Sequence, residues 1–206
     1  MKKALAGLFL LFGSTTVLAS GLDLALSNET ANLTFTLNPD PLFYGSQAQE
    51  VAGGSEIALG AFITEDGANI LHATLLARGY RQSVNSQYQI SAGMKLIGGE
   101  IKVEESRAAA GREETVGALG LGFQAGLLLR QSPYNPVELS IEGFYAPSIT
   151  SFTDAERYSE ITTRLQVEVM PRARVYFGYR RLRFDTNDFD NVRLDRSAHF
   201  GMSISF

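Results

Sequence analysis

Between residues 56 and 206 the chain repeats one pattern, in which apolar and polar residues alternate and turn residues interrupt the alternation. Successive residues of an extended strand point to opposite sides, so this alternation predicts β-strands with one apolar and one polar face. An amphipathic helix would instead need apolar residues at intervals of three and four. Eight such segments can be traced, over residues 56–64, 71–78, 87–96, 119–130, 137–145, 161–169, 174–180 and 194–206.

The strand pattern leaves two architectures open, because alternation does not say which face lies inside. In a soluble barrel or sandwich the apolar face is the core and the charged face meets water. In a transmembrane β-barrel the apolar face meets lipid, and each strand needs about 9–11 residues to cross the bilayer. The segment lengths fit the second architecture. We therefore expect Leu121, Phe123, Leu165 and Val167 to face hydrocarbon while Arg164 and Glu168 face the interior.

The spacing of the segments favours the membrane. Short connections near residues 81–86, 132–136 and 170–172 alternate with longer polar ones at 98–115, 147–157 and 185–193. Outer-membrane barrels combine short periplasmic turns with long external loops in this way, and they place aromatic rings at both lipid boundaries. The aromatic residues expected at those boundaries are Tyr80, Tyr88, Tyr134, Tyr145, Tyr158, Tyr179 and Phe184.

The last segment adds a third signal. Phe200, Met202, Ile204 and Phe206 occupy every second position to the end of the sequence. This pattern resembles the signal by which outer-membrane barrels are recognised for assembly, so we expect the barrel-assembly machinery to be a partner through Phe206. Outer-membrane lipid and lipopolysaccharide are the other expected partners, and no nucleic acid is expected, because the formal net charge is −4.

The fold class predicted is an all-β, closed antiparallel transmembrane barrel, with eight strands favoured and ten possible. The uncertainty concerns residues 21–54, where two short alternating runs precede the strong stop Asn38-Pro39-Asp40-Pro41. These runs are either one strand pair or a segment that precedes the barrel. The predicted organisation is thus a leader over residues 1–20, an N-terminal segment over residues 21–54 and a barrel over residues 55–206.

Residues 1–20 are predicted to be a signal peptide. Lys2 and Lys3 precede an apolar stretch over Ala4–Phe12, and Val17-Leu18-Ala19 offers small residues for cleavage after Ala19, with Ser20 as the alternative. The predicted location is the outer membrane of a Gram-negative cell.

The chain contains no cysteine, which excludes a disulfide scaffold, a zinc ribbon and a thiol enzyme.

The polar faces predict a charge network in the barrel interior. Charges buried there should pair, because an unpaired buried charge is costly. Three glutamates are expected to pair with three arginines on neighbouring strands: Glu138, Glu142 and Glu168 with Arg164, Arg174 and Arg180. Such a network indicates a rigid filling of the barrel, a narrow porin-like pore, or a site for a ligand or lipid.

No catalytic, cofactor or metal site is predicted. His72 and His199 are the two histidines, and His199 follows Asp195 and Ser197 on one face of the last strand. Same-face neighbours on a strand lie about 6–7 Å apart, too far for a catalytic relay. The function predicted is therefore a non-enzymatic outer-membrane barrel. An outer-membrane lipid-modifying enzyme and a soluble periplasmic lipocalin-like carrier are the alternatives.

Several short motifs in the second half of the chain carry a resemblance. Gly143-Phe144-Tyr145-Ala146-Pro147 closes a segment, Met170-Pro171 precedes Val175-Tyr176-Phe177-Gly178-Tyr179-Arg180, and Gly201-Met202-Ser203-Ile204-Ser205-Phe206 ends the chain. In these motifs the sequence resembles the YfaZ family of predicted outer-membrane proteins. The resemblance implies an outer-membrane barrel and no established activity, so it supplies no catalytic residues.

Overall fold

Strands make up nearly all of the computed structural model, which describes residues 20–39, 53–103, 112–130, 135–189 and 191–206. Residues 1–19 of the predicted leader and Tyr134 lie outside the described residues, whereas Ser20 is the first residue of β1. Among the described residues no helix is long and apolar enough to cross a membrane. The elements are β1 (Ser20–Leu26), β2 (Thr30–Leu37), β3 (Gly53–Thr64), β4 (Asn69–Gln82), β5 (Ser86–Val103), β6 (Arg112–Leu129), β7 (Val137–Ala146), the 3₁₀ turn η3 (Ser148–Thr150), β8 (Ser151–Thr153), β9 (Ala155–Met170), β10 (Ala173–Thr186) and β11 (Val192–Ser205).

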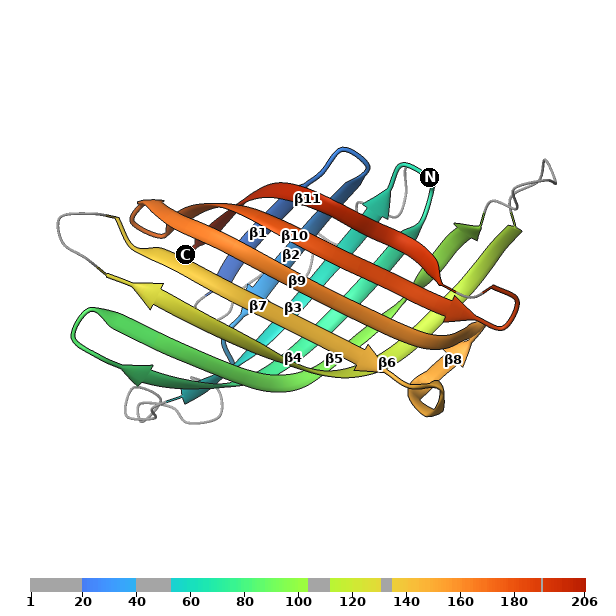
Figure 1. The fold of residues 1–206 in the computed structure, drawn as a ribbon, viewed down its shortest axis with the longest axis horizontal. Coiled ribbons are helices and arrows are strands. Elements are labelled where there is room, and N and C mark those ends of the chain that lie inside the picture. The colour runs from blue at the N-terminus through green and yellow to red at the C-terminus, as the bar shows by residue number, and fades with distance from the viewer. Residues whose placement is uncertain (1–19, 40–52, 104–111, 131–134, 190) are drawn as a thin grey trace, which may run out of the picture.

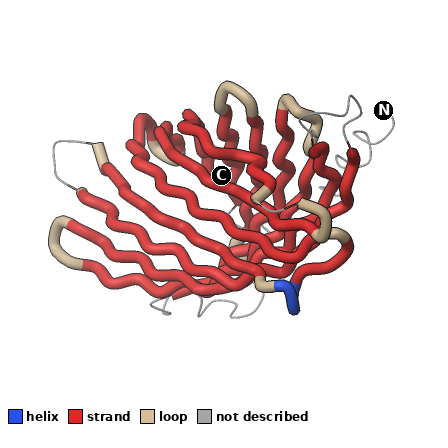
Figure 2. Tube along the Cα trace, turned by 45° about the vertical axis from the view of Figure 1, so that its right-hand side comes forward, coloured by secondary structure: helices blue, strands red, loops and turns tan. Residues whose placement is uncertain are grey.

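The strands form a closed antiparallel barrel of ten strands (Figures 1 and 2). Each long strand pairs with the next along the chain, β5 pairs with β6, and β1 pairs with β11 to complete the ring. The three-residue β8 is an addition to β6 beyond the end of β7, and it does not count as a barrel strand. The expectation of eight strands is wrong, and ten is the correct number.

The two additional strands are β1 and β2, which come from residues 21–54. They form a hairpin, with Leu24 opposite Leu33, and the hairpin lies between β3 and β11. Without it, β3 and β11 would each have an edge of unpaired backbone groups, which a bilayer does not tolerate. The stop at Asn38-Pro39 ends β2, but the barrel continues at β3.

The two ends of the barrel differ in their connections. We call the end that carries residues 104–111, 147–154 and 187–191 the long-loop end, and the opposite end, with the turns at 83–85 and 171–172, the short-turn end. The expectation that short connections lie at one end of the barrel and long connections at the other is only partly correct. Residues 38–52 join β2 to β3 at the short-turn end, and most of the loop expected over 98–115 is strand.

Apolar side chains cover the outside of the barrel. Leu121, Phe123 and Leu165 are 64%, 52% and 49% exposed, and the outward positions of every long strand are occupied in the same way. Arg164 and Glu168 face the interior instead. The orientation expected from the alternation is thus the one observed. A soluble carrier would require the reverse, with these apolar side chains inside.

The apolar surface forms a band of limited height. The outward residues of β6 run from Leu119 to Leu129, and ten residues of a strand tilted by about 40° rise about 25 Å. Tyr88, Tyr145 and Tyr179 lie outward, as expected of boundary rings. The same expectation is wrong for Tyr158 and Phe184, which are fully buried inside the barrel, and for Tyr80, which lines the interior.

Beyond this band, at the long-loop end, the polarity of the wall is inverted. On β10 the exposed Arg181 is followed by the inward, buried Leu182 and Phe184. A β-bulge between β10 and β11 also turns Leu194 toward the interior, although its spacing from Ala198 predicts an outward position. This part of the barrel is built like a water-soluble barrel, with a polar outside and an apolar inside.

Candidate functional site: the barrel interior

The interior has two parts that differ in polarity. The half toward the long-loop end is filled by apolar side chains, which we call the apolar plug. The half toward the short-turn end contains a polar cavity of about 510 Å³. A layer of buried ion pairs lies between the two. Each part follows from the inward positions of the strands, because every second residue points inside.

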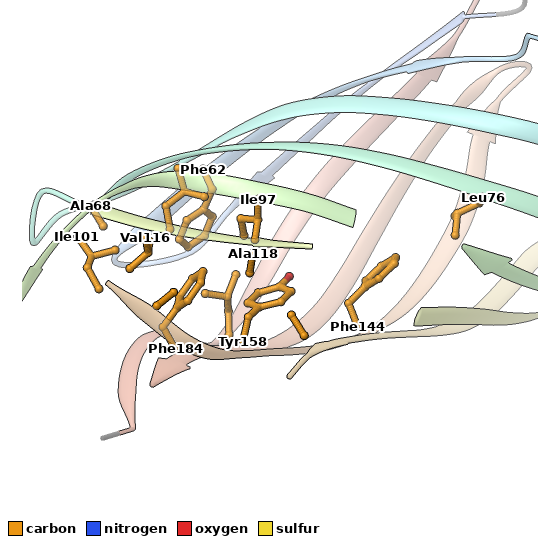
Figure 3. Close-up of a cluster of buried hydrophobic side chains, with 14 residues drawn as sticks. Phe62, Ala68, Leu76, Ile97, Ile101, Val116, Ala118, Phe144, Tyr158 and Phe184 are labelled. Atoms are coloured by element: carbon orange, nitrogen blue, oxygen red, sulfur yellow. The ribbon is translucent and has the colours of Figure 1, made fainter. Parts of the chain in front are cut away.

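The apolar plug brings together inward residues of seven strands and Ala68 from the turn between β3 and β4, and Figure 3 shows Phe62, Ile97, Tyr158 and Phe184 gathered inside the barrel. The Tyr158 and Phe184 rings pack with their centroids 5.1 Å apart. Gly120 allows this packing, because a Cβ there would lie 3.3 Å from the Tyr158 ring. The buried members are Phe62, Ala68, Ile70, Leu76, Ile97, Ile101, Val116, Ala118, Phe144, Ala146, Ala155, Tyr158, Leu182 and Phe184.

Two buried ion pairs lie against the plug. Lys95 Nζ is 2.5 Å from Glu160 Oε2, and the Tyr158 hydroxyl also donates to this carboxylate. Arg180 Nε donates to Asp195 Oδ2 at 2.7 Å.

The two cations of this layer also contact aromatic rings of the plug. The Arg180 guanidinium lies 4.5 Å from the centre of the Phe62 ring, and Lys95 Nζ lies 5.3 Å from that of Phe144. The cations therefore join the polar and apolar parts of the interior.

The polar cavity contains further pairs. Asp23 of β1 accepts hydrogen bonds from Arg164 at 3.4 Å and from the Tyr176 hydroxyl at 2.7 Å. Closer to the short-turn end, Arg78 pairs with Glu56. The lining continues to Arg130, which is exposed at the end of β6, so the cavity opens at the short-turn end.

The six residues of the predicted charge network all lie on inward positions, but their pairing differs in part from the expectation. Arg174 contacts Glu138 at 3.3 Å and Glu168 at 4.0 Å, as expected. Arg164 and Arg180 instead bind the aspartates Asp23 and Asp195. Glu142 forms no ion pair with any described residue.

The difference arises from β1 and β11. Ring closure places Asp23 opposite Ser203, beside β10, and the bulge in β11 brings Asp195 next to Arg180. Asp23 was overlooked because its run was not assigned to the barrel. The signal was present, since Asp23 is the single polar residue between Leu22 and Leu24.

The histidines do not form a relay. His72 lies 3.2 Å from Asn32 Oδ1. His199 is 1% exposed and presents an edge to the Tyr176 ring at 5.9 Å, and neither ring nitrogen has a hydrogen-bond partner among the described residues. Ser197 donates to Asp195, which Arg180 already binds. No group of residues suited to a metal ion occurs in the described part of the chain.

Comparison with solved structures finds other barrels of low similarity. The chain is similar to LpxR from Salmonella typhimurium, with a TM-score of 0.38 and 8% identity over 91% of this chain and 99% of that chain. For the NanC porin the TM-score is 0.36 with 10% identity, over 92% and 99%. For the CymD monoaromatic hydrocarbon channel it is 0.33 with 11% identity, over 92% and 65%.

Comparison with sequences is more informative about the family. No curated protein matches the chain. A family model described as YfaZ precursor matches residues 92–206, which is more than half of the sequence and includes β6 to β11. The motifs that carried the resemblance lie within this range, and the chain belongs to the YfaZ family.

Proposed function

We propose that this protein is an integral outer-membrane β-barrel without enzymatic activity, and that its interior is closed to ions. The observation that carries the proposal is the continuous apolar band on the outside of a closed barrel whose interior holds ion pairs. Soluble proteins rarely expose a contiguous apolar surface of this extent. The export leader expected over residues 1–20 supports the outer membrane as the location.

The apolar plug favours a closed interior over a pore. The polar cavity reaches only from the short-turn end to the layer of Lys95 and Arg180, and Phe62, Tyr158 and Phe184 lie beyond it. An ion that passed this point would have to lose its hydration among closely packed apolar rings, which is costly. The buried ion pairs then serve to hold the wall of the barrel in one geometry.

The inward position of both histidines supports a non-enzymatic role. An enzyme that acts on membrane lipid needs its reactive groups at the lipid-facing surface. His199 is buried among interior side chains, and His72 bonds to Asn32 inside the barrel. We expect the same membrane lipid profile when wild-type protein and H199A are overproduced. A change seen only with the wild type would contradict the absence of enzymatic activity.

Two measurements test the main proposal. Membrane fractionation with a gel-shift test on heating should find a heat-modifiable protein in the outer membrane, and recovery in the soluble fraction without detergent would overturn this assignment. In planar bilayers the folded wild type should give no steady ion current. The double variant F62A/F184A, which removes two plug rings, should conduct.

A matched control keeps the conductance test specific. The variant L121A/F123A removes similar volume from the lipid-facing surface and leaves the plug intact, so it should stay silent. A steady current through the folded wild type, or equal silence of F62A/F184A in a correctly folded barrel, would show that the plug is not the barrier.

A further inference from the structure

Four arginines form a cluster on the outside of β10 and β11, at the long-loop end. The strand register places Arg181 directly opposite Arg196, and Arg183 directly opposite Arg193. Directly opposed side chains on antiparallel strands have Cβ atoms about 4.5–5.5 Å apart, and like charges in that arrangement destabilise a sheet. We call these four residues the arginine cluster.

No described carboxylate neutralises the arginine cluster. None of its members forms an ion pair with a described carboxylate. Arg183 donates to the Ser159 hydroxyl at 2.9 Å and Arg196 to the Tyr179 hydroxyl at 3.4 Å, and both acceptors are neutral. The nearest outward carboxylate on β10, Asp185, is occupied by Arg157 at 3.2 Å.

The other side of the barrel provides a contrast at the long-loop end. On β5 and β6 the outward Lys102 pairs with Glu113 at 3.5 Å, and Glu100 lies on the same face. Opposite charges are therefore mixed on that side, as on an ordinary solvated surface. The opposed arginines of β10 and β11 have no such alternation of charge, so they are a local feature of this surface.

The height of the cluster matches that of lipid headgroups. Tyr179 is the last outward aromatic residue of β10 within the apolar band, and Arg181 follows two residues later, about 5 Å higher along the barrel axis. A depression of about 430 Å³ beside the cluster is lined by Tyr145, Arg157, Ser159, Arg183, Asp185 and Asn191. The cluster thus meets the polar edge of the leaflet at the long-loop end.

We propose that the arginine cluster binds the phosphate groups of lipopolysaccharide in the outer leaflet, an inference that rests on the proposed function. Paired guanidinium groups bind phosphate oxygens through charge-assisted, bidentate hydrogen bonds. A phosphate between Arg181 and Arg196 would remove the repulsion that the register imposes. The lipid chains attached to it would lie on the apolar band directly below.

The test measures binding of lipid A, the phosphorylated membrane anchor of lipopolysaccharide, to the detergent-solubilised folded barrel by native mass spectrometry. The wild type should retain phosphorylated lipid A, and R181Q/R196Q should bind it about tenfold or more weakly, because two charge-assisted contacts are lost. The control R81Q/R172Q removes the same charge at the short-turn end, where both residues are exposed, and should bind like the wild type.

Comparison ligands distinguish the proposed lipid from other sources of phosphate. Dephosphorylated lipid A should bind weakly to every variant, and inorganic phosphate at the same concentration should not displace lipid A. Equal binding of phosphatidylglycerol would reduce the cluster to a general anionic-surface contact and overturn the proposal. So would unchanged lipid A binding by R181Q/R196Q. Failure of the proposed function would instead appear as a protein that fractionates without membrane and shows no heat-modifiable form.

Discussion

The buried pair of Lys95 and Glu160 gives a quantitative prediction. Their charged atoms lie 2.5 Å apart, and the side chains are 7% and 4% exposed. We expect Lys95→Met to leave the Glu160 carboxylate with the Tyr158 hydroxyl as its one hydrogen-bond donor among the described residues. The variant should therefore unfold more readily than the wild type.

The expected size follows from the burial. Breaking a buried pair by removing one partner costs about 3–5 kcal/mol of unfolding free energy, because it leaves a charge without its partner. The contact of Lys95 with the Phe144 ring is lost as well, which adds about 0.5–2 kcal/mol. Replacing both partners, in K95M/E160L, should recover most of the loss, since no unpaired charge remains.

A second lysine of the same strand provides the control. Lys102 also pairs with a glutamate, Glu113, but at 3.5 Å and with side chains 47% and 64% exposed. Exposed pairs contribute about 0–1 kcal/mol, so K102M should unfold almost like the wild type. The difference between K95M and K102M then isolates the effect of burial.

The measurement is urea unfolding of the folded barrel in lipid vesicles, followed by circular dichroism and by the loss of the heat-modifiable band. The unfolding free energies of K95M, E160L, K95M/E160L and K102M give the coupling between the two buried groups. A loss below about 1 kcal/mol in K95M, or a loss equal to that in K102M, would refute the reasoning. It would mean that water solvates the pair inside the barrel.

Three further predictions test the orientation and packing of the wall. Leu165→Arg places a charge on the lipid face and should cost about 2–4 kcal/mol near the bilayer centre, whereas Gln166→Arg, which enters the polar cavity, should assemble normally in a membrane-integration assay. Gly117→Val should displace the Phe152 ring and loosen β8 enough to increase protease cleavage there, because the added Cβ would lie 2.4 Å from that ring. Arg174→Gln should change the urea midpoint little, since its pairs are partly exposed and at least 3.3 Å long. A large shift would contradict this view of the cavity.

The alternation of the sequence was enough to predict eight of the ten barrel strands and the face that each presents outward. The prediction succeeded because every strand crosses the same layer of hydrocarbon, where each outward side chain must be apolar. The hairpin of β1 and β2 was harder to assign, since each run is short and Asn38-Pro39 interrupts the chain before β3. These strands are required only because the barrel must close, and closure depends on all the strands together and not on the residues of the hairpin itself.

The interior could be predicted less well than the wall. Individual inward residues follow from alternation, but their partners depend on which strands become neighbours, as Asp23 and Asp195 illustrate. The apolar plug was not predicted because apolar residues were assigned to the outward face, whereas the plug residues are apolar and point inward. Leu182 and Phe184 are in phase with Arg180, and this reversal is the signal that could have revealed the plug.

The pairing of β1 with β11 has a consequence for how the molecule comes into being. Gly21 lies opposite Ser205, so the ring joins residues that are separated by almost the whole chain. Contacts between such distant residues form late and slowly. Until β11 pairs with β1, β1 and β11 each keep one edge of unpaired backbone groups. An assembly factor that covers both exposed strand edges before closure would therefore protect the folding chain from aggregation.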